Sequence, residues 1–227
     1  DVLFIDEIHR LPAAVEEYIY PAMEDCKIDF TLDSGMHARV VTYALQPFTL
    51  IGATTRAGLL TGALRSRFGI VHNIRFYDCD ELSAILQQAS AKLALQTPSE
   101  EAFTRIASRS RGTPRIALRL LRRVRDYAQI KHNGDINISV VNAALELEGI
   151  DEAGLDTLDR AYLATLSGVY EGGPVGVEAI AASLGEDAGT LQDVVEPYLL
   201  QAGMLARTRQ GRKITSSGLK HLNLKSK

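Results

Sequence analysis

The sequence Val2-Leu3-Phe4-Ile5-Asp6-Glu7 decides the fold of the first part of this 227-residue chain. A short run of apolar residues is typical of a strand that is buried on both faces of a parallel sheet. Two acidic residues follow where this strand would end. Because ligands collect at the carboxyl ends of parallel strands, the acids favour a binding site there. A strand whose acids only cap the next loop explains the same pattern equally well.

A second apolar segment, 48–52, leads into Thr54 and Thr55. It predicts a neighbouring strand, which would place hydroxyl groups beside the two acids. An ordinary turn is the alternative for these threonines. Between the two strands, helical spacing predicts a helix that starts with Pro12 and runs to Met23.

Residues 27–45 predict a β-hairpin, because alternating apolar residues lie on both sides of Asp33-Ser34-Gly35. The tip of this hairpin, including Met36, is a candidate exposed surface for a partner, although packing on the protein's own core is the alternative.

The second half of the chain is predicted to be largely helical. Apolar periodicity predicts helices over 80–95, 99–110, 114–132 and 139–148. The third has an apolar stripe for the core (Ile116, Leu120, Val124, Tyr127) and an arginine stripe for a ligand, a partner or water (Arg115, Arg119, Arg122). Residues 148–154 predict a linker. The segment 155–227 predicts a winged helix, with a helix over 188–201 and a two-stranded wing that turns at Gly211.

The composition excludes several classes of protein. The sequence is 46% hydrophobic and 23% charged, and no uninterrupted apolar stretch is long enough to span a bilayer. Cys26 and Cys79 make no disulfide framework, which favours a reducing, cytoplasmic location. The five histidines lack metal-ligand spacing. Because Asp1 opens directly onto an apolar run, we expect the natural N-terminus to lie upstream.

Arginines gather in local groups although the net charge is −3. Arg65 and Arg67 lie in LRSRFG, and Arg115 follows Gly112-Thr113-Pro114 at the start of a predicted helix. An arginine fork can neutralise the charge on a transferring phosphoryl group. For any single arginine, a surface salt bridge is the simpler alternative. A further basic group lies near the C-terminus (Arg207, Arg209, Arg212, Lys213).

The order of these motifs resembles the AAA+ ATPases. Particular strings resemble the RuvB family of Holliday-junction branch-migration motors: LFIDEIHRL, VEEYIYPAMED, PFTLIGATTRAG, LRSRFGIV, RGTPRIALRLLRRVRD and GGPVG. The resemblance covers essentially the whole chain. It implies an α/β fold with part of an AAA+ core and its parallel sheet over 1–76, a helical lid over 77–150, and a winged-helix DNA-binding domain over 151–227.

The resemblance also implies roles for individual residues. Asp6 and Glu7 match the Walker B acids, of which Asp6 holds Mg²⁺ through water and Glu7 is the catalytic base. Thr55, with Thr54 beside it, matches a sensor of the γ-phosphate. Arg67 matches the arginine finger that reaches a neighbouring subunit's nucleotide, and Arg65 is the fallback.

Further nucleotide contacts are implied at Glu24, Asp25, Cys26, Tyr77 and Arg115. The family often has an aromatic residue in place of Cys26, so that contact is in doubt. Arg207 and Arg212 match wing arginines that meet DNA phosphates, although this wing lacks a proline that the family often carries at its turn.

The implied function is ATP- and Mg²⁺-dependent translocation on double-stranded DNA. The implied partners are five further copies in a homohexamer, RuvA at the 27–45 hairpin, a Holliday junction and RuvC, with no membrane. Two alternatives are a non-catalytic DNA- or partner-binding module and a clamp-loader-like subunit.

One expected motif does not occur in the sequence. No G-x-x-x-x-G-K-[ST] loop is present in the 227 residues, so no lysine and no glycine loop cradle the β- and γ-phosphates. We therefore expect this chain alone not to hydrolyse ATP. The part of the sheet that would carry this loop is also missing, so we expect Val2–Ile5 and Leu50–Ile51 to be partly exposed.

Overall fold

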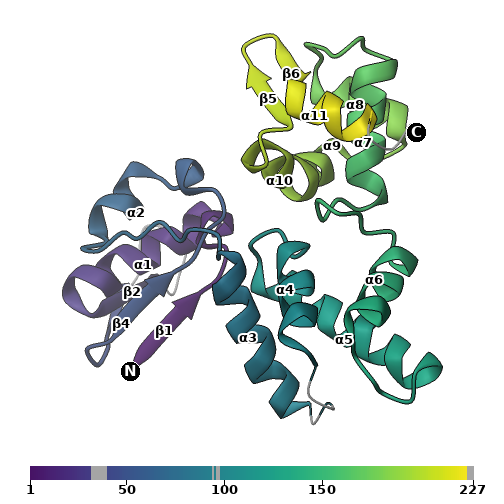
Figure 1. Cartoon of the computed structure of the whole chain (residues 1–227). Helices are drawn as coiled ribbons and strands as arrows, with labels where there is room; N and C mark the ends of the chain where they lie inside the picture. Colours follow the sequence, from purple (N-terminus) through teal and green to yellow (C-terminus); the bar gives the residue numbers. More distant parts are fainter. Residues whose placement is uncertain (32–39, 94, 96–97, 224–227) are drawn as a thin grey trace. The chain divides into compact units, whose positions relative to one another are not determined.

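The computed structural model describes residues 1–31, 40–93, 95 and 98–223, which form two compact units, Asp1–Ile74 and Arg75–Lys227 (Figure 1). The predicted hairpin turn and Met36 lie outside the described residues. Among the helices that are described, none is long and apolar enough to cross a membrane.

The first unit is built on two parallel strands. β1 (Val2–Ile5) pairs with β4 (Thr49–Gly52), with Ile5 opposite Gly52. Both predicted strands are therefore confirmed. The prediction that β1 is buried on both faces is wrong for this chain, since Phe4 is 58% exposed. The two strands have too few neighbours to bury their side chains on both faces of the sheet. The expected partial exposure of both strands is confirmed.

A helix and a hairpin lie between these strands in sequence. α1 (Ala13–Asp25) follows Pro12, which is the N-cap and not the first helical residue as predicted. β2 (Lys27–Thr31) and β3 (Val40–Ala44) are the antiparallel strands of the predicted hairpin. The rings of Tyr18 and Phe30 stack with centroids 5.8 Å apart and join α1 to β2.

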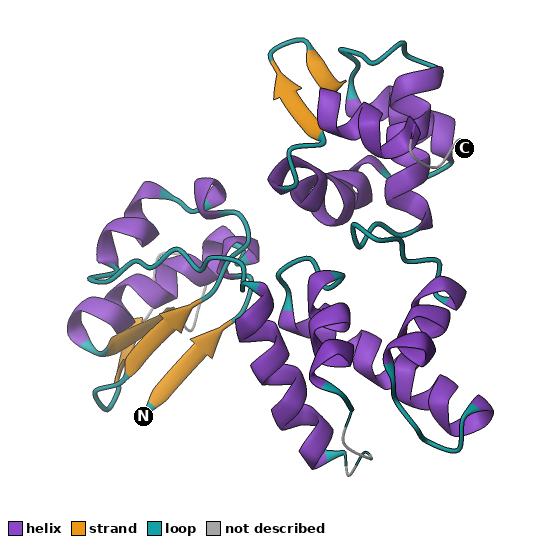
Figure 2. Cartoon of the chain, in the orientation of Figure 1, coloured by secondary structure: helices purple, strands orange, loops and turns teal. Residues whose placement is uncertain are grey.

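The first part of the second unit is a helical domain (Figure 2). It comprises α3 (Cys79–Lys92), α4 (Glu100–Ser108), α5 (Pro114–Lys131) and α6 (Ile138–Leu147), close to the four predicted helices. Leu120 and Val124 of α5 are buried in its core. Arg115, Arg119 and Arg122 are exposed, as their spacing predicts.

The second part of this unit is a winged helix with its own core. Its elements are α7 (Thr157–Gly168), α8 (Val177–Leu184), α9 (Ala188–Thr190), η3 (Leu191–Val195), α10 (Glu196–Gln201), β5 (Leu205–Thr208), β6 (Gly211–Ile214) and α11 (Ser216–Asn223). β5 and β6 are the antiparallel strands of the predicted wing. The predicted regular helix over 188–201 is wrong in one respect, because a π-helical turn, η3, interrupts it.

Candidate functional site

The carboxyl ends of β1 and β4 bring Glu7 and Thr55 together. The strand pairing continues past both strands, because Ala53 N donates to Ile5 O and Ile8 N donates to Ala53 O, each at 2.9 Å. Glu7 then turns away from the strand with a left-handed backbone, φ 48°. Its Oε2 accepts hydrogen bonds from the Thr55 backbone N–H at 3.3 Å and the Thr55 hydroxyl at 3.1 Å.

These hydrogen bonds orient the Glu7 carboxylate and favour its ionised form. The N–H of Thr55 is the largest influence, and it lowers the pKa of the Glu7 carboxyl below its ordinary value against the smaller opposing effect of desolvation. Hydrogen bonds from N–H and O–H donors favour a carboxylate over a carboxylic acid. Glu7 is therefore ionised at neutral pH and can accept a proton.

Thr54 has different contacts from Thr55. Its hydroxyl lies 2.8 Å from His9 Nδ1, and it accepts the Arg56 N–H at 3.0 Å. His9 Nδ1 is also 3.2 Å from Glu7 Oε2, so the imidazole connects Thr54 to Glu7. No sequence motif had predicted a role for His9. Its place two residues after Glu7, on the turn that leaves β1, is the signal that could have identified it.

Asp6 lies at the end of β1 with an exposed side chain. One of its oxygens accepts the Glu7 N–H at 3.0 Å. Within the described ranges, no three His, Cys, Asp or Glu side chains form a metal-binding group. An exposed carboxylate beside Glu7 fits a hydrated Mg²⁺ that would take most of its other ligands from water and phosphate oxygens.

Arg67 lies at the end of α2 (Gly62–Arg67) and contacts α1. Its guanidinium is 2.9 Å from a Glu24 carboxylate oxygen and 4.4 Å from the centre of the Tyr20 ring. The fold thus brings Arg67 and Glu24 together, and Asp25 and Cys26 follow at the end of α1. Arg65 is exposed.

Tyr77 and Arg115 belong to the second unit. Tyr77 N donates to Gly112 O at 2.9 Å, which places Tyr77 beside the turn that leads into α5. A Cβ on Gly112 would lie 2.7 Å from the Phe76 Cβ, and the φ of Gly112 is +65°, so this close approach requires glycine. Arg115 follows in the first turn of α5, where it is exposed.

The wing arginines meet a buried acid. Glu196, at the start of α10, has a side chain that is 0% exposed. Its carboxylate is 2.5 Å from Arg207 and 2.9 Å from Arg212, and it accepts the Tyr162 hydroxyl at 2.9 Å. The side chain of Arg212 is only 18% exposed, so its ion pair with Glu196 is largely buried and stabilises the wing.

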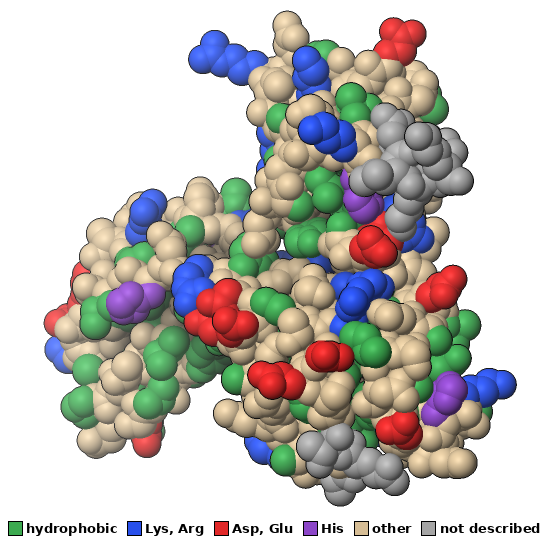
Figure 3. Space-filling view, in the orientation of Figure 1, with side chains coloured by type: hydrophobic (Ala, Val, Ile, Leu, Met, Phe, Trp, Pro, Cys, Tyr) green, Lys and Arg blue, Asp and Glu red, His purple; other side chains and the backbone are tan. Residues whose placement is uncertain are grey.

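The exposed tip of the wing carries other cations. Arg209 and Lys213 are exposed, and the side chain of Arg207 is 48% exposed despite its ion pair. Lys and Arg side chains protrude from the surface of the winged helix in Figure 3. Arg209 belongs to the basic group predicted near the C-terminus but was not among the predicted DNA contacts. Glu196 was not among the predicted site residues.

Comparison with known proteins gives matches in each part of the chain. Residues 1–74 match the Holliday junction DNA helicase RuvB P-loop domain, residues 77–151 match the RuvB AAA lid domain, and residues 152–223 match the RuvB C-terminal winged helix domain. The Thermotoga maritima RuvB Holliday junction branch migration motor matches with a TM-score of 0.84 and 50% identity, over 98% of this chain and 70% of that chain. This chain belongs to the RuvB family.

Other RuvB proteins give the same result. A point mutant of Thermotoga maritima RuvB has a TM-score of 0.87 at 50% identity, again over 98% of this chain and 70% of that chain. The Holliday junction branch migration complex subunit RuvB of Desulfosudis oleivorans is 53% identical over 224 residues, which are 99% of this chain and 65% of that relative. The chain therefore spans about two thirds of this curated relative. The predicted AAA+ core, lid and winged helix of the RuvB family are confirmed.

Glu196→Gln tests the electrostatic support of the wing. We expect the free energy of unfolding of the winged helix to fall by about 3–5 kcal/mol, because the change leaves two arginines beside a buried group without charge. Chemical denaturation of the 227-residue chain measures this loss. Glu186→Gln, at an exposed position, is the matched control and should change stability by less than about 0.5 kcal/mol. Equal stability of the two variants would contradict a supporting role for Glu196.

Proposed function

We propose that this chain carries part of the catalytic machinery and the DNA-binding domain of an ATP-driven motor that moves Holliday junctions. The observation that carries the proposal is the ionised Glu7 carboxylate, which Thr55 holds at the carboxyl ends of two parallel strands. Such an ionised acid beside a hydroxyl suits a base that activates a water molecule for attack on the γ-phosphate.

The other residues of the first unit have complementary roles. When bound, Mg²⁺ would neutralise charge on the phosphate oxygens of ATP. Asp6 would hold that ion, and Thr55 orients the attacking water beside Glu7. Arg67 stabilises the developing phosphoryl charge on a nucleotide held by a neighbouring subunit. Its stacking on Tyr20 and its ion pair with Glu24 fix the direction of the guanidinium before the nucleotide arrives.

The remaining nucleotide contacts come from several segments. Asp25 and Cys26 lie beside Glu24 at the end of α1, Tyr77 packs near the adenine, and Arg115 contacts the phosphates. A P-loop is needed to cradle those phosphates, and the 227 residues do not contain its sequence pattern. We therefore expect hydrolysis only where a P-loop region is joined to this chain.

The winged helix binds the phosphates of double-stranded DNA through its wing. Arg209, Lys213 and the exposed part of Arg207 make the contacts, and Arg212 holds the wing through Glu196. Phosphate contacts carry no sequence preference, which suits a motor that must move along any DNA.

The proposed motor has protein partners. Six copies form a ring, so that Arg67 of one subunit reaches the nucleotide of the next. RuvA docks on the β2–β3 hairpin, whose Phe30, Val41 and Tyr43 are exposed apolar residues suited to a protein partner. RuvC acts on the same junction, and the assembly is cytoplasmic.

Arg67→Ala tests the finger, with Arg65→Ala as the matched control. In the complete, P-loop-containing protein, we expect Arg67→Ala to lower the rate of ATP hydrolysis by at least about 10³-fold, because an arginine finger contributes that much to phosphoryl transfer. Arg65→Ala should lose far less, and ATP binding should persist in both. A larger loss in Arg65→Ala would move the finger to Arg65. Full activity in both variants would overturn the ATPase proposal.

Arg209→Ala tests the DNA contacts of the wing. We expect weaker binding to duplexes of any sequence, with the slope of log affinity against log salt reduced by about one, as for the loss of one phosphate contact. A salt titration of duplex binding by the 227-residue chain measures this. Arg123→Ala, on the exposed surface of α5, is the control. An unchanged slope in Arg209→Ala would exclude that residue from the interface.

A further inference from the structure

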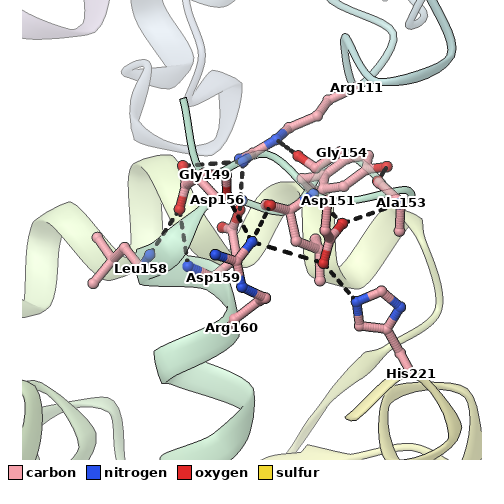
Figure 4. A network of polar contacts seen from close by, with 12 residues as sticks. Arg111, Gly149, Asp151, Ala153, Gly154, Asp156, Leu158, Asp159, Arg160 and His221 are labelled. Carbon is pink, nitrogen blue, oxygen red and sulfur yellow. Dashed lines mark hydrogen bonds and ion pairs between the residues drawn. The ribbon is translucent and has the colours of Figure 1, made fainter. Parts of the chain in front are cut away.

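Arg111 reaches from the lid to the winged helix (Figure 4). It lies in the turn between α4 and α5, yet all of its side-chain hydrogen bonds go to residues more than 40 positions later. Its Nε donates to Gly154 O at 2.8 Å. Another of its nitrogens donates to Asp156 at 3.0 Å and to Asp159, both at the start of α7.

The contact is buried and specific. The Arg111 side chain is 9% exposed and that of Asp159 is 1% exposed. The guanidinium also lies 5.2 Å from the centre of the Tyr198 ring, in α10. Burial raises the pKa of Asp159 to about 6, against the opposing effect of Arg111, so most Asp159 carboxyls are ionised at pH 7.5. A buried guanidinium without acceptors would cost free energy, so these three acceptors together fix the direction of the Arg111 side chain.

The backbones at this junction also touch. A Cβ on Gly154 would lie 2.8 Å from Arg109 O, so the segment before α7 presses against the turn that carries Arg111. Arg111 and Gly112 both have positive φ, 53° and 65°, which gives this turn one defined shape. Two hydrogen bonds brace the turn: Thr113 N donates to Ser110 O, and the Thr113 hydroxyl donates to Arg111 O.

The winged helix holds the connecting segment from its own side as well. Arg160 donates to Gly149 O at 2.7 Å, and Tyr198 donates to Ala153 O at 2.6 Å. Asp151 is buried, and its carboxylate is 2.9 Å from His221 in α11. Residues 148–154, predicted only as a linker, are therefore anchored along their length to both domains.

Arg111 lies four residues before Arg115. The braced turn leads directly into α5, whose first turn carries Arg115. Hydrogen bonds therefore connect the turn that carries Arg111 to the first turn of α5, and the Arg111 guanidinium contacts the start of α7.

We propose that Arg111 is a positioning residue that couples the nucleotide site to the DNA-binding domain. It joins Arg115 to α7, so that the lid and the winged helix respond to nucleotide as one body. The inference rests on the proposed function, because it requires Arg115 to contact nucleotide and the wing to contact DNA. Arg111 itself touches neither ligand.

Arg111→Gln in the complete, P-loop-containing protein tests the coupling. We expect the ratio of DNA-stimulated to basal ATP hydrolysis to fall by at least about fivefold, the lower end of typical coupling between two sites. Basal hydrolysis and the affinity for duplex DNA should stay within about twofold of the unmodified protein, well below that coupling effect. Asp159→Asn should reproduce the loss, and the double variant should be no worse than either single one. Arg123→Gln, which removes an exposed arginine of α5, should leave the ratio intact.

Failure of the coupling and failure of the proposed function give different results. If DNA stimulates hydrolysis equally in the unmodified protein and in Arg111→Gln, only the coupling role of Arg111 is overturned. An unmodified protein that shows no DNA-stimulated hydrolysis overturns the proposed function and the inference with it. If Arg111→Gln lowers basal hydrolysis as much as it lowers the ratio of DNA-stimulated to basal hydrolysis, Arg111 has only a structural role and the inference is overturned. If Arg111→Gln does not fold, Asp159→Asn gives the same test, because Asp156 and the introduced amide oxygen can still accept hydrogen bonds from Arg111.

Discussion

The parallel pairing of β1 with β4 is the constraint on which the candidate catalytic site depends. The paired residues Ile5 and Gly52 are 47 positions apart in sequence, and the register of the two strands brings the residues that follow them into contact. Because the pairing continues past both strands, Glu7 meets the backbone N–H and the hydroxyl of Thr55. Those two donors fix the position of the carboxylate and lower its pKa. The chemistry proposed for this site therefore follows from the strand register and not from the acids alone.

The second unit depends on buried charges instead of strand pairing. Glu196 holds the wing through Arg207 and Arg212, and Arg111 holds the start of α7 through Asp159. Each acid is almost fully buried and would be costly without its arginine partners. These pairs give the wing and the junction between the lid and the winged helix a defined geometry.

Much of the fold could be predicted from the sequence because apolar periodicity is a local property. It predicted both strands of the small sheet, the lid helices and the wing. The partners of Glu196 and Arg111 could not be predicted, since they lie 11 and 48 positions away in Arg207 and Asp159 and depend on tertiary packing. The π-helical turn η3 lies just before Pro197, which cannot donate a backbone hydrogen bond inside the predicted helix. The exposure of Phe4 follows from the small size of the sheet, which the apolar run itself does not reveal.

Single-turnover ATP hydrolysis by Thr55→Val in the complete, P-loop-containing protein tests the central claim most directly. Valine keeps the shape of threonine but removes the hydroxyl that faces Glu7. We expect ATP binding close to that of the unmodified protein. Hydrolysis should be at least about tenfold slower, because Glu7 and the attacking water lose their alignment. Thr54→Val, which removes the hydroxyl facing His9, should slow hydrolysis less. Unchanged hydrolysis in Thr55→Val, or a larger loss in Thr54→Val, would contradict the account.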